Sequence, residues 1–216
     1  MTFRSIAPAL VLAGALIGTL VLGGCARSGA AAPAAQGVPA ALSLRALGSL
    51  TNYRARLTSG TTAHPMTIRT QVHSPENWAS TSGYTVLHIG AQSYVHFGSR
   101  WFAHADRPGR YAQTNLPSFA RQFYAMTRVG GVRLRRGGPC HQGGLTGDTW
   151  TLRAAAGSNF GETFSACVAR GSGALLRLVV GASGVALGGR YAREVYDITA
   201  VGGVPAFRPP TVLSDR

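Results

Sequence analysis

The chain has 216 residues, enough for one domain with a substantial core but not for two of ordinary size. Hydrophobic residues make up 45% and charged residues 13%, a composition that excludes a chain kept disordered by charge. All 21 basic residues are arginine and the net charge is +14, which favours anionic partners such as lipid headgroups, wall polymers or an acidic ligand. A bias of composition accounts for arginine in place of lysine.

The first 24 residues have the organisation of a secretory signal. One positive charge, Arg4, precedes an apolar run over residues 6–22 that is short and rich in glycine and alanine for a membrane-spanning helix. The run ends in Leu22-Gly23-Gly24-Cys25, which resembles the lipobox of bacterial lipoproteins, where the cysteine is diacylated and becomes the new N-terminus. We therefore predict a signal peptide over residues 1–24 and lipid attachment, such as palmitate, at Cys25.

Lipid attachment at Cys25 implies a place on the extracytoplasmic side of a cell membrane or outer membrane. Residues 25–38 are rich in Ala, Gly, Ser and Pro without periodicity, which predicts a flexible tether. The expected domain then covers residues 39–210, and residues 211–216 form a tail. Nucleic acid is not an expected partner in that compartment.

The first predicted element of the domain is a short amphipathic helix that starts at Pro39 and ends between Gly48 and Asn52. Leu44, Leu47 and, with slight drift, Leu50 share its apolar face. Short alternating segments follow at residues 53–57, 66–72, from 78 onward, 83–89, 92–97 and 100–104. Their connections of two to four residues predict an antiparallel meander.

A second helix is predicted from Pro117 or Ser118, because apolar residues at 116, 119, 120, 123 and 126 recur at helical spacing before Gly130. Further strands are expected over residues 132–136, 146–154, 163–169, 174–180 and 190–199. Residues 171–173 read as a hairpin turn, residues 181–189 as a looser turn, and residues 205–210 as an extended tail.

Six stretches carry a likeness to a known family: Ser49-Leu-Thr-Asn-Tyr53, His73-Ser-Pro-Glu-Asn-Trp78, Ile89-Gly-Ala-Gln-Ser-Tyr94, Gly98-Ser-Arg-Trp101, Arg170-Gly-Ser-Gly173-Ala-Leu-Leu-Arg177 and Tyr196-Asp-Ile198. In this order, and with the lipobox, the chain resembles bacterial lipoproteins of the LolA/LolB-like fold, including the LppX/LprG type. The likeness covers roughly residues 39–210. It implies an α+β fold, in which a strongly curved antiparallel sheet (an incomplete β-barrel) has helices packed on its concave face and holds acyl chains or a hydrophobic partner.

A curved sheet of this kind needs an apolar inner surface. Candidate residues for a hydrophobic cavity are Tyr53, Ile68, Trp78, Tyr84, Phe97, Phe119 and Phe123. The same side chains can instead form a filled core. The sequence leaves this open, because a shift of one residue in register moves every side chain of a strand to the opposite face.

Two cysteines remain after Cys25, and an oxidising compartment predicts a disulfide between them. Cys140 lies in the Gly-rich segment 137–144, read as a flexible loop, and Cys167 lies on a predicted strand. The alternative, in which Cys140 and His141 act as nucleophile and base, lacks a third group to orient them.

Three histidines, His88, His96 and His104, recur every eight residues across consecutive predicted strands. The parity of the connecting turns places His96 on the opposite face from His88, and no carboxylate lies nearby in the sequence. We therefore predict no metal site.

The densest group of basic residues is Arg128, Arg133, Arg135 and Arg136. Residues 133 and 135 share one face of a predicted strand. The group can contact anionic lipid headgroups, or it can form a solvated strand edge that discourages pairing with other chains. The sequence favours neither.

Motifs of hydrolases, zinc proteases, phosphate-binding loops and dinucleotide-binding folds are absent from the sequence, and its seven acidic residues form no obvious acid–base pair. We predict no catalytic residues and no cofactor. The first hypothesis is a membrane-anchored lipoprotein that binds a lipid or other hydrophobic ligand, in lipid or lipoprotein transport. The alternative is a structural or regulatory envelope lipoprotein that binds a protein partner and has no ligand cavity.

Overall fold

The computed structural model describes residues 42–61, 64–105, 115–129, 132–154, 162–182 and 192–212. They belong to one compact unit over Gly37–Arg216. Its elements, in chain order, are α1 (Leu44–Leu47), β1 (Tyr53–Thr61), β2 (His64–Ser74), β3 (Asn77–Ser82), β4 (Tyr84–Ile89), β5 (Gln92–Phe97), β6 (Arg100–Ala105), α2 (Leu116–Met126), β7 (Val132–Gln142), β8 (Leu145–Ala154), β9 (Glu162–Ala169), β10 (Leu175–Ala182) and β11 (Ala192–Val201). No helix of the described residues is long and apolar enough to cross a membrane.

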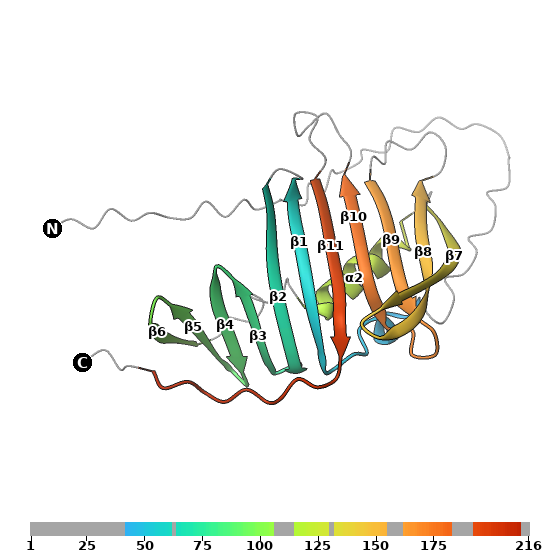
Figure 1. Cartoon of the computed structure of the whole chain (residues 1–216). Helices are drawn as coiled ribbons and strands as arrows, with labels where there is room; N and C mark the ends of the chain where they lie inside the picture. Colours follow the sequence, from blue (N-terminus) through green and yellow to red (C-terminus); the bar gives the residue numbers. More distant parts are fainter. Residues whose placement is uncertain are drawn as a thin grey trace, which may run out of the picture. The chain divides into compact units, whose positions relative to one another are not determined.

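The strands form one antiparallel sheet in the order β6-β5-β4-β3-β2-β1-β11-β10-β9-β8-β7 (Figure 1). On each side, strands that follow one another along the chain lie next to each other. The two sets meet where β1 pairs with β11, with Leu57 opposite Tyr196 and Arg56 opposite Asp197. The sheet is therefore open, with β6 and β7 as its described edges, and the expected antiparallel meander is confirmed.

Glycines make the tight turns of the first meander. Gly90 between β4 and β5 and Gly98 between β5 and β6 have φ angles of +60° and +62°. A side chain with a Cβ rarely adopts this conformation, whereas glycine does so without steric penalty. The alternating segments between these glycines consequently pair as the sequence predicted.

The first helix differs from the prediction. α1 is a single turn that begins after Ser43, whose hydroxyl oxygen accepts a hydrogen bond from the Ala46 N–H, and it ends at Gly48. Leu42 and Leu47 are buried, whereas Leu44, expected on the apolar face, is exposed. The difference arises because the helix is capped at Ser43, later than the expected start, and ends at Gly48, so that too few residues remain for an amphipathic face. The expected start at Pro39 lies outside the described residues.

The segment around Cys140 is a strand, so the prediction of a loop at residues 137–144 is wrong. β7 continues to Gln142, with a break in register between Arg136 and Pro139. Such a bulge accommodates a proline, which has no N–H for the ladder. The turn to β8 comes later, at Gly143 and Gly144, whose φ angles are +61° and +82°.

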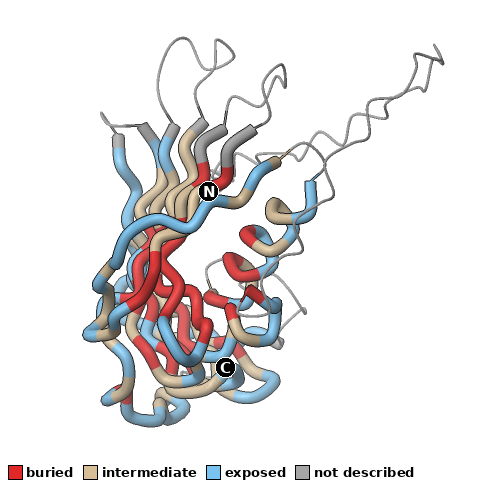
Figure 2. The backbone as a smooth tube through the Cα atoms, turned by 90° about the vertical axis from the view of Figure 1, so that its right-hand side faces the viewer, coloured by how far each residue is buried: buried red, intermediate tan, exposed pale blue. Residues whose placement is uncertain are grey.

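Helix α2 packs against one face of the sheet. Asn115 caps it by accepting a hydrogen bond from the Ser118 N–H at 3.1 Å. Its start at Leu116 agrees with the predicted second helix within the usual uncertainty of helix ends. Its buried residues are Leu116, Phe119, Ala120 and Phe123. Figure 2 shows the buried stretches of the strands and those of α2 turned toward each other.

After β11 the chain runs back past the ends of the first strands (Figure 1). The Asn52 side chain donates to the Val204 carbonyl at 2.9 Å and accepts from the Val204 N–H at 3.0 Å. The Asn77 side chain makes the same pair of hydrogen bonds to Phe207, so the expected extended segment over residues 205–210 is attached to the sheet. The predicted loose turn at 181–189 lies almost entirely outside the described residues.

Candidate ligand-binding face of the sheet

The two faces of the sheet differ in character. Side chains alternate along each strand, so directly paired residues share a face. Leu57 of β1 pairs with Tyr196 of β11, which pairs with Leu178 of β10. We call the face that carries these residues the inner face and the opposite one the outer face. The buried hydrophobic strand residues of the inner face include Tyr53, Ala55, Leu57, Val72, Trp78, Val86, Leu152, Phe164, Ala166, Val168, Leu175, Leu178, Tyr196 and Ile198.

Two contacts attach α2 to the centre of the inner face. The ring of Phe119 stacks on that of Tyr196, with centroids 4.2 Å apart. The hydroxyl oxygen of Tyr53 accepts a hydrogen bond from the Leu116 N–H at 3.1 Å. Burial raises the pKa of both tyrosines, and the Leu116 hydrogen bond partly opposes this rise at Tyr53. The centre of the face is therefore aromatic and uncharged.

The structure divides the seven candidate cavity residues. Tyr53, Trp78, Phe119 and Phe123 are buried in one cluster, and Ile68 packs against that cluster while partly buried. Tyr84 and Phe97 lie outside it, with 48% and 73% of their surface exposed. Five of the seven are thus brought together in one cluster, and the other two are exposed on the sheet.

The exposed part of the inner face carries several apolar side chains, and exposed Arg100 lies among them, opposite Phe97. Tyr84, Phe97 and Phe102 all share the face of Val86. Tyr84 is two residues before Val86 on β4. Val95 pairs with both Val86 and Phe102, and Phe97 is two residues after Val95. Phe102 is 40% exposed, and Met66, opposite Ser59 and next but one to Ile68, is 51% exposed. We call Met66, Tyr84, Phe97 and Phe102 the apolar extension. Met66 and Phe102 were not among the sequence candidates. Once the register is known, Met66 is found because it is two residues from Ile68 on the same strand, and Phe102 because it pairs with Val95.

The inner face also carries polar and ionisable side chains, among them Arg100 opposite Phe97 and His104 opposite Ser93. His88 lies with its ring stacked on Trp78 at 5.1 Å and its Nδ1 3.1 Å from the Ser93 hydroxyl. Glu194 pairs with Val180 opposite, and burial raises the pKa of its carboxyl. A carboxyl in such a place titrates closer to neutral pH than one in water.

The histidines lie as the turn parity predicted. His88 pairs with Trp78 on the inner face, whereas His96 pairs with Thr85 and lies by Trp101 on the outer face. Within the described residues, no group of three or more His, Cys, Asp or Glu side chains is placed to hold a metal ion.

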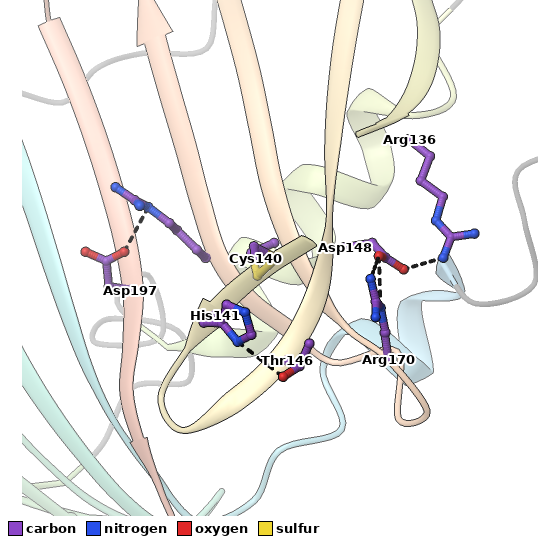
Figure 3. The surroundings of a disulfide bond; sticks show 9 residues. Arg136, Cys140, His141, Thr146, Asp148, Arg170 and Asp197 are labelled. Carbon is purple, nitrogen blue, oxygen red and sulfur yellow. Dashed lines mark hydrogen bonds and ion pairs between the residues drawn. A yellow bond between two sulfur atoms is a disulfide. The ribbon is translucent and has the colours of Figure 1, made fainter. Parts of the chain in front are cut away.

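A disulfide joins Cys140 of β7 to Cys167 of β9, with their Cα atoms 6.1 Å apart (Figure 3). The two residues belong to a second apolar cluster with Ala169, Ala174 and Leu176. The predicted cross-link is therefore present in the structure, and Cys140 has no thiol to act as a nucleophile. His141 instead lies with its Nδ1 3.2 Å from the Thr146 hydroxyl.

The four clustered arginines of the sequence do not form one patch. Arg136 is ion-paired with Asp148, whose other oxygen accepts from Arg170 at 2.7 Å (Figure 3). Hydrogen bonds from Arg170 and then from Arg136 lower the pKa of Asp148. Arg128 lies over the Tyr124 ring at 4.8 Å. Arg133 and Arg135 are exposed on edge strand β7, and Arg135 is on the outer face through its pairing with Thr151.

The predicted lipid-attachment residue Cys25 and the tether over residues 25–38 lie outside the described residues. The same holds for the signal peptide over residues 1–24. These features remain predictions from the sequence.

No protein-family model and no curated protein sequence matches the chain. Solved structures do. LppX, a lipoprotein of Mycobacterium tuberculosis, is 15% identical over 77% of this chain and 99% of its own, with a TM-score of 0.41. LprF of Mycobacterium bovis is 11% identical over 80% of this chain and 97% of its own, with a TM-score of 0.47.

A third similar structure is MucB of Pseudomonas aeruginosa in complex with MucA, which is 15% identical over 76% of this chain and 56% of its own, with a TM-score of 0.39. The similar structures thus include the LppX type that the sequence resembles. At these identities a likeness concerns the fold alone, so any ligand or partner has to follow from this chain's own residues.

Proposed function

We propose that this chain is a membrane-anchored lipoprotein of the extracytoplasmic side that binds a lipid or another hydrophobic ligand. The ligand lies on the inner face, which is the concave face of the sheet, beside α2. The protein is a binding protein and not an enzyme. Its role is in the transport of lipids or lipoproteins.

The apolar extension is the observation that carries this proposal. Its four side chains lie on the same face as the buried cluster, yet between 40% and 73% of their surface is exposed. Several exposed apolar side chains on one face of a sheet can mark a site that binds a partner or ligand. An acyl chain laid across β2–β6 would cover these side chains and reach the aromatic centre beside α2.

The anchor explains why such a face is useful. Cys25, diacylated and made the new N-terminus by removal of residues 1–24, holds the chain at a bilayer, and residues 25–38 let the domain over residues 39–210 reach its surface. Labelling of cells with radioactive palmitate tests this step. We expect label in the wild-type chain and none in the Cys25→Ala variant, whereas label in both would overturn the anchor.

The test of ligand binding uses chain that carries Cys25→Ala, so that no attached acyl group enters the extract. Organic extraction and mass spectrometry of the purified protein are expected to release one lipid in stoichiometric amount. A fluorescent acyl chain of palmitate length then serves as a titration probe. We expect Phe97→Ser with Phe102→Ser to weaken probe binding by about tenfold or more, because each ring loses apolar contact with the probe.

A matched pair controls for the loss of surface hydrophobicity. Leu44→Ser with Val129→Ser removes two exposed apolar side chains outside the sheet and should leave probe binding unchanged. An empty extract together with no binding of the probe would overturn the lipid-binding function.

The alternative function, a structural or regulatory envelope lipoprotein with a filled core and a protein partner, is favoured by one feature. Among the described strands β6 is an edge of the sheet; it carries exposed Phe102, and exposed Phe97 lies on the adjacent strand β5. An extended peptide could add to this edge and place alternate side chains on the apolar extension. Cross-linking from an edge position such as Ala103 would then capture a protein, and the extract would contain no lipid.

A further inference from the structure

The outer face carries a row of charged side chains across four neighbouring strands. Arg69 of β2 is opposite Arg56 of β1, Arg56 is opposite Asp197 of β11, and Asp197 is opposite Arg177 of β10. Neighbouring strands lie about 4.8 Å apart, so the row extends over about 14 Å. We call these four residues the outer row.

Asp197 holds two arginines of the outer row in place. Its carboxylate lies 3.3 Å from Arg56 Nη2 and 3.1 Å from Arg177 Nε. The Asp197 side chain is only 7% exposed, whereas those of Arg56 and Arg177 are 52% and 43% exposed. The Asp197 carboxylate neutralises only one of the two guanidinium charges. The group of Arg56, Asp197 and Arg177 therefore keeps one net positive charge, with further guanidinium N–H donors at the surface.

Arg69 adds an uncompensated charge to the outer row. It is exposed and directly across from Arg56, and like charges in this position destabilise a sheet. In the described part of the chain, no carboxylate lies within ion-pair distance of Arg69. An anion bound against both guanidiniums would remove this repulsion.

Further arginines extend the charged surface along the strands. Arg54 lies two residues from Arg56 on the same face, and its Nη2 donates to the Gly203 carbonyl at 3.0 Å. Arg193 of β11, opposite Gly181, is four residues from Asp197 and exposed. On the described strands β2, β1, β11 and β10, Asp197 is therefore the one carboxylate of a face that has five arginines.

We propose that the outer face, centred on the outer row, docks on a bilayer that contains anionic phospholipids. Guanidinium groups pair with phosphate through two parallel hydrogen bonds, and arginine is less strongly hydrated than lysine. Arginines spread both across and along four strands can contact several phosphates at once, which suits a bilayer surface better than a single small anion. The surface works whether or not the inner face holds a lipid.

Vesicle sedimentation tests the docking surface. The Cys25→Ala chain, which has no acyl anchor, is mixed with phosphatidylcholine vesicles with and without phosphatidylglycerol. We expect binding to the anionic vesicles alone, and a decrease as salt is raised. Arg69→Gln with Arg193→Gln should weaken that binding by about 25-fold, because each arginine near an anionic surface contributes about fivefold.

A control pair carries the same change of charge elsewhere. Arg45 on α1 and Arg121 on α2 are exposed and lie away from the outer face, so Arg45→Gln with Arg121→Gln should change vesicle binding by less than about twofold. An unchanged melting temperature in both variants shows that the fold is retained.

Three results would overturn the docking surface. Equal losses in both pairs would mean that the net charge of the chain attracts it to vesicles. Unchanged binding in the Arg69 and Arg193 variant would mean that the outer face is not used. Release of the protein by inorganic phosphate, but not by chloride at equal ionic strength, would mean a site for free phosphate.

Discussion

The Asn77 side chain pairs with both backbone groups of Phe207, which follows it by 130 residues along the chain. Its Nδ2 donates to the Phe207 carbonyl at 3.0 Å, and its Oδ1 accepts from the Phe207 N–H at 2.9 Å. Asn52 holds Val204 in the same way. Two asparagines thus replace the backbone of a neighbouring strand and fix the C-terminal segment against the sheet.

Asn77→Ala is expected to release this segment at Phe207. Two hydrogen bonds are lost from a partly buried place, so the free energy of unfolding should fall by about 1–2 kcal/mol. Amide exchange at Phe207 should accelerate more than exchange within β11. Gln71→Ala, which removes an exposed amide on β2, should leave both quantities unchanged, and equal effects in the two variants would contradict the clamp.

Phe119→Ala should be among the most destabilising changes in the chain. The ring is buried between α2 and Tyr196, so its removal leaves a cavity in the main core and is expected to lower the free energy of unfolding by about 3–5 kcal/mol. Urea denaturation measures this loss. Phe97→Ala deletes the same ring at an exposed position and should change stability by less than about 1 kcal/mol.

The disulfide should be detectable and stabilising. Mass spectrometry of non-reduced protein is expected to show one peptide cross-link between Cys140 and Cys167, and two free thiols would refute it. The bond spans 27 residues, so replacing both cysteines by alanine should lower the free energy of unfolding by about 3–4 kcal/mol in the chain-entropy model.

Asp148 is expected to contribute to acid unfolding. Its two arginine partners hold its pKa below the unfolded value of about 3.9, so its contribution to stability is full above that value. The contribution is lost as the pH falls through the folded pKa. The stability difference between wild type and Asp148→Asn should therefore shrink from pH 5 to pH 2, and a constant difference would contradict the ion pairs.

Glu194 is expected to have the opposite pH dependence. Burial raises its pKa in the folded state above the unfolded value of about 4.3, so stability is greatest below that value and falls as the pH rises through the folded pKa. Glu194→Gln removes the titrating carboxyl and with it this loss of stability at higher pH. Relative to wild type, the variant should gain stability between pH 4 and pH 8, and a parallel pair of pH profiles would exclude a buried carboxyl.

Much of the secondary structure was predictable because short-range signals encode it. The alternation in residues 92–97, bounded by glycines at 90 and 98, matches β5 to the residue. The segment around Cys140 was misread because Gly137, Gly138 and Pro139 look like a loop. The strand tolerates these three residues because a bulge falls between Arg136 and Pro139. At the bulge the ladder does not require an N–H donor from Pro139, which has none.

The candidate site was predictable only in part. Tyr53, Trp78, Phe119 and Phe123 are buried together as expected of a shared apolar surface. Tyr84 and Phe97 are equally hydrophobic, yet they stay exposed because α2 packs against the centre of the sheet and not over β4–β6. The sequence of a strand does not show whether a helix from another part of the chain will cover its side chains.

By itself, the sequence indicated most of the strands and turns and the pairing of Cys140 with Cys167, and it supports the prediction of a lipobox that ends at Cys25. These features depend on neighbouring residues or on the compartment. Only the tertiary structure decided that β1 pairs with β11, and with it which face each side chain occupies. Arg56, Arg69 and Asp197 are far apart in the sequence, and they form one row only through strand pairing. Because side chains alternate between the two faces of a strand, the register of pairing decides which of them share a face.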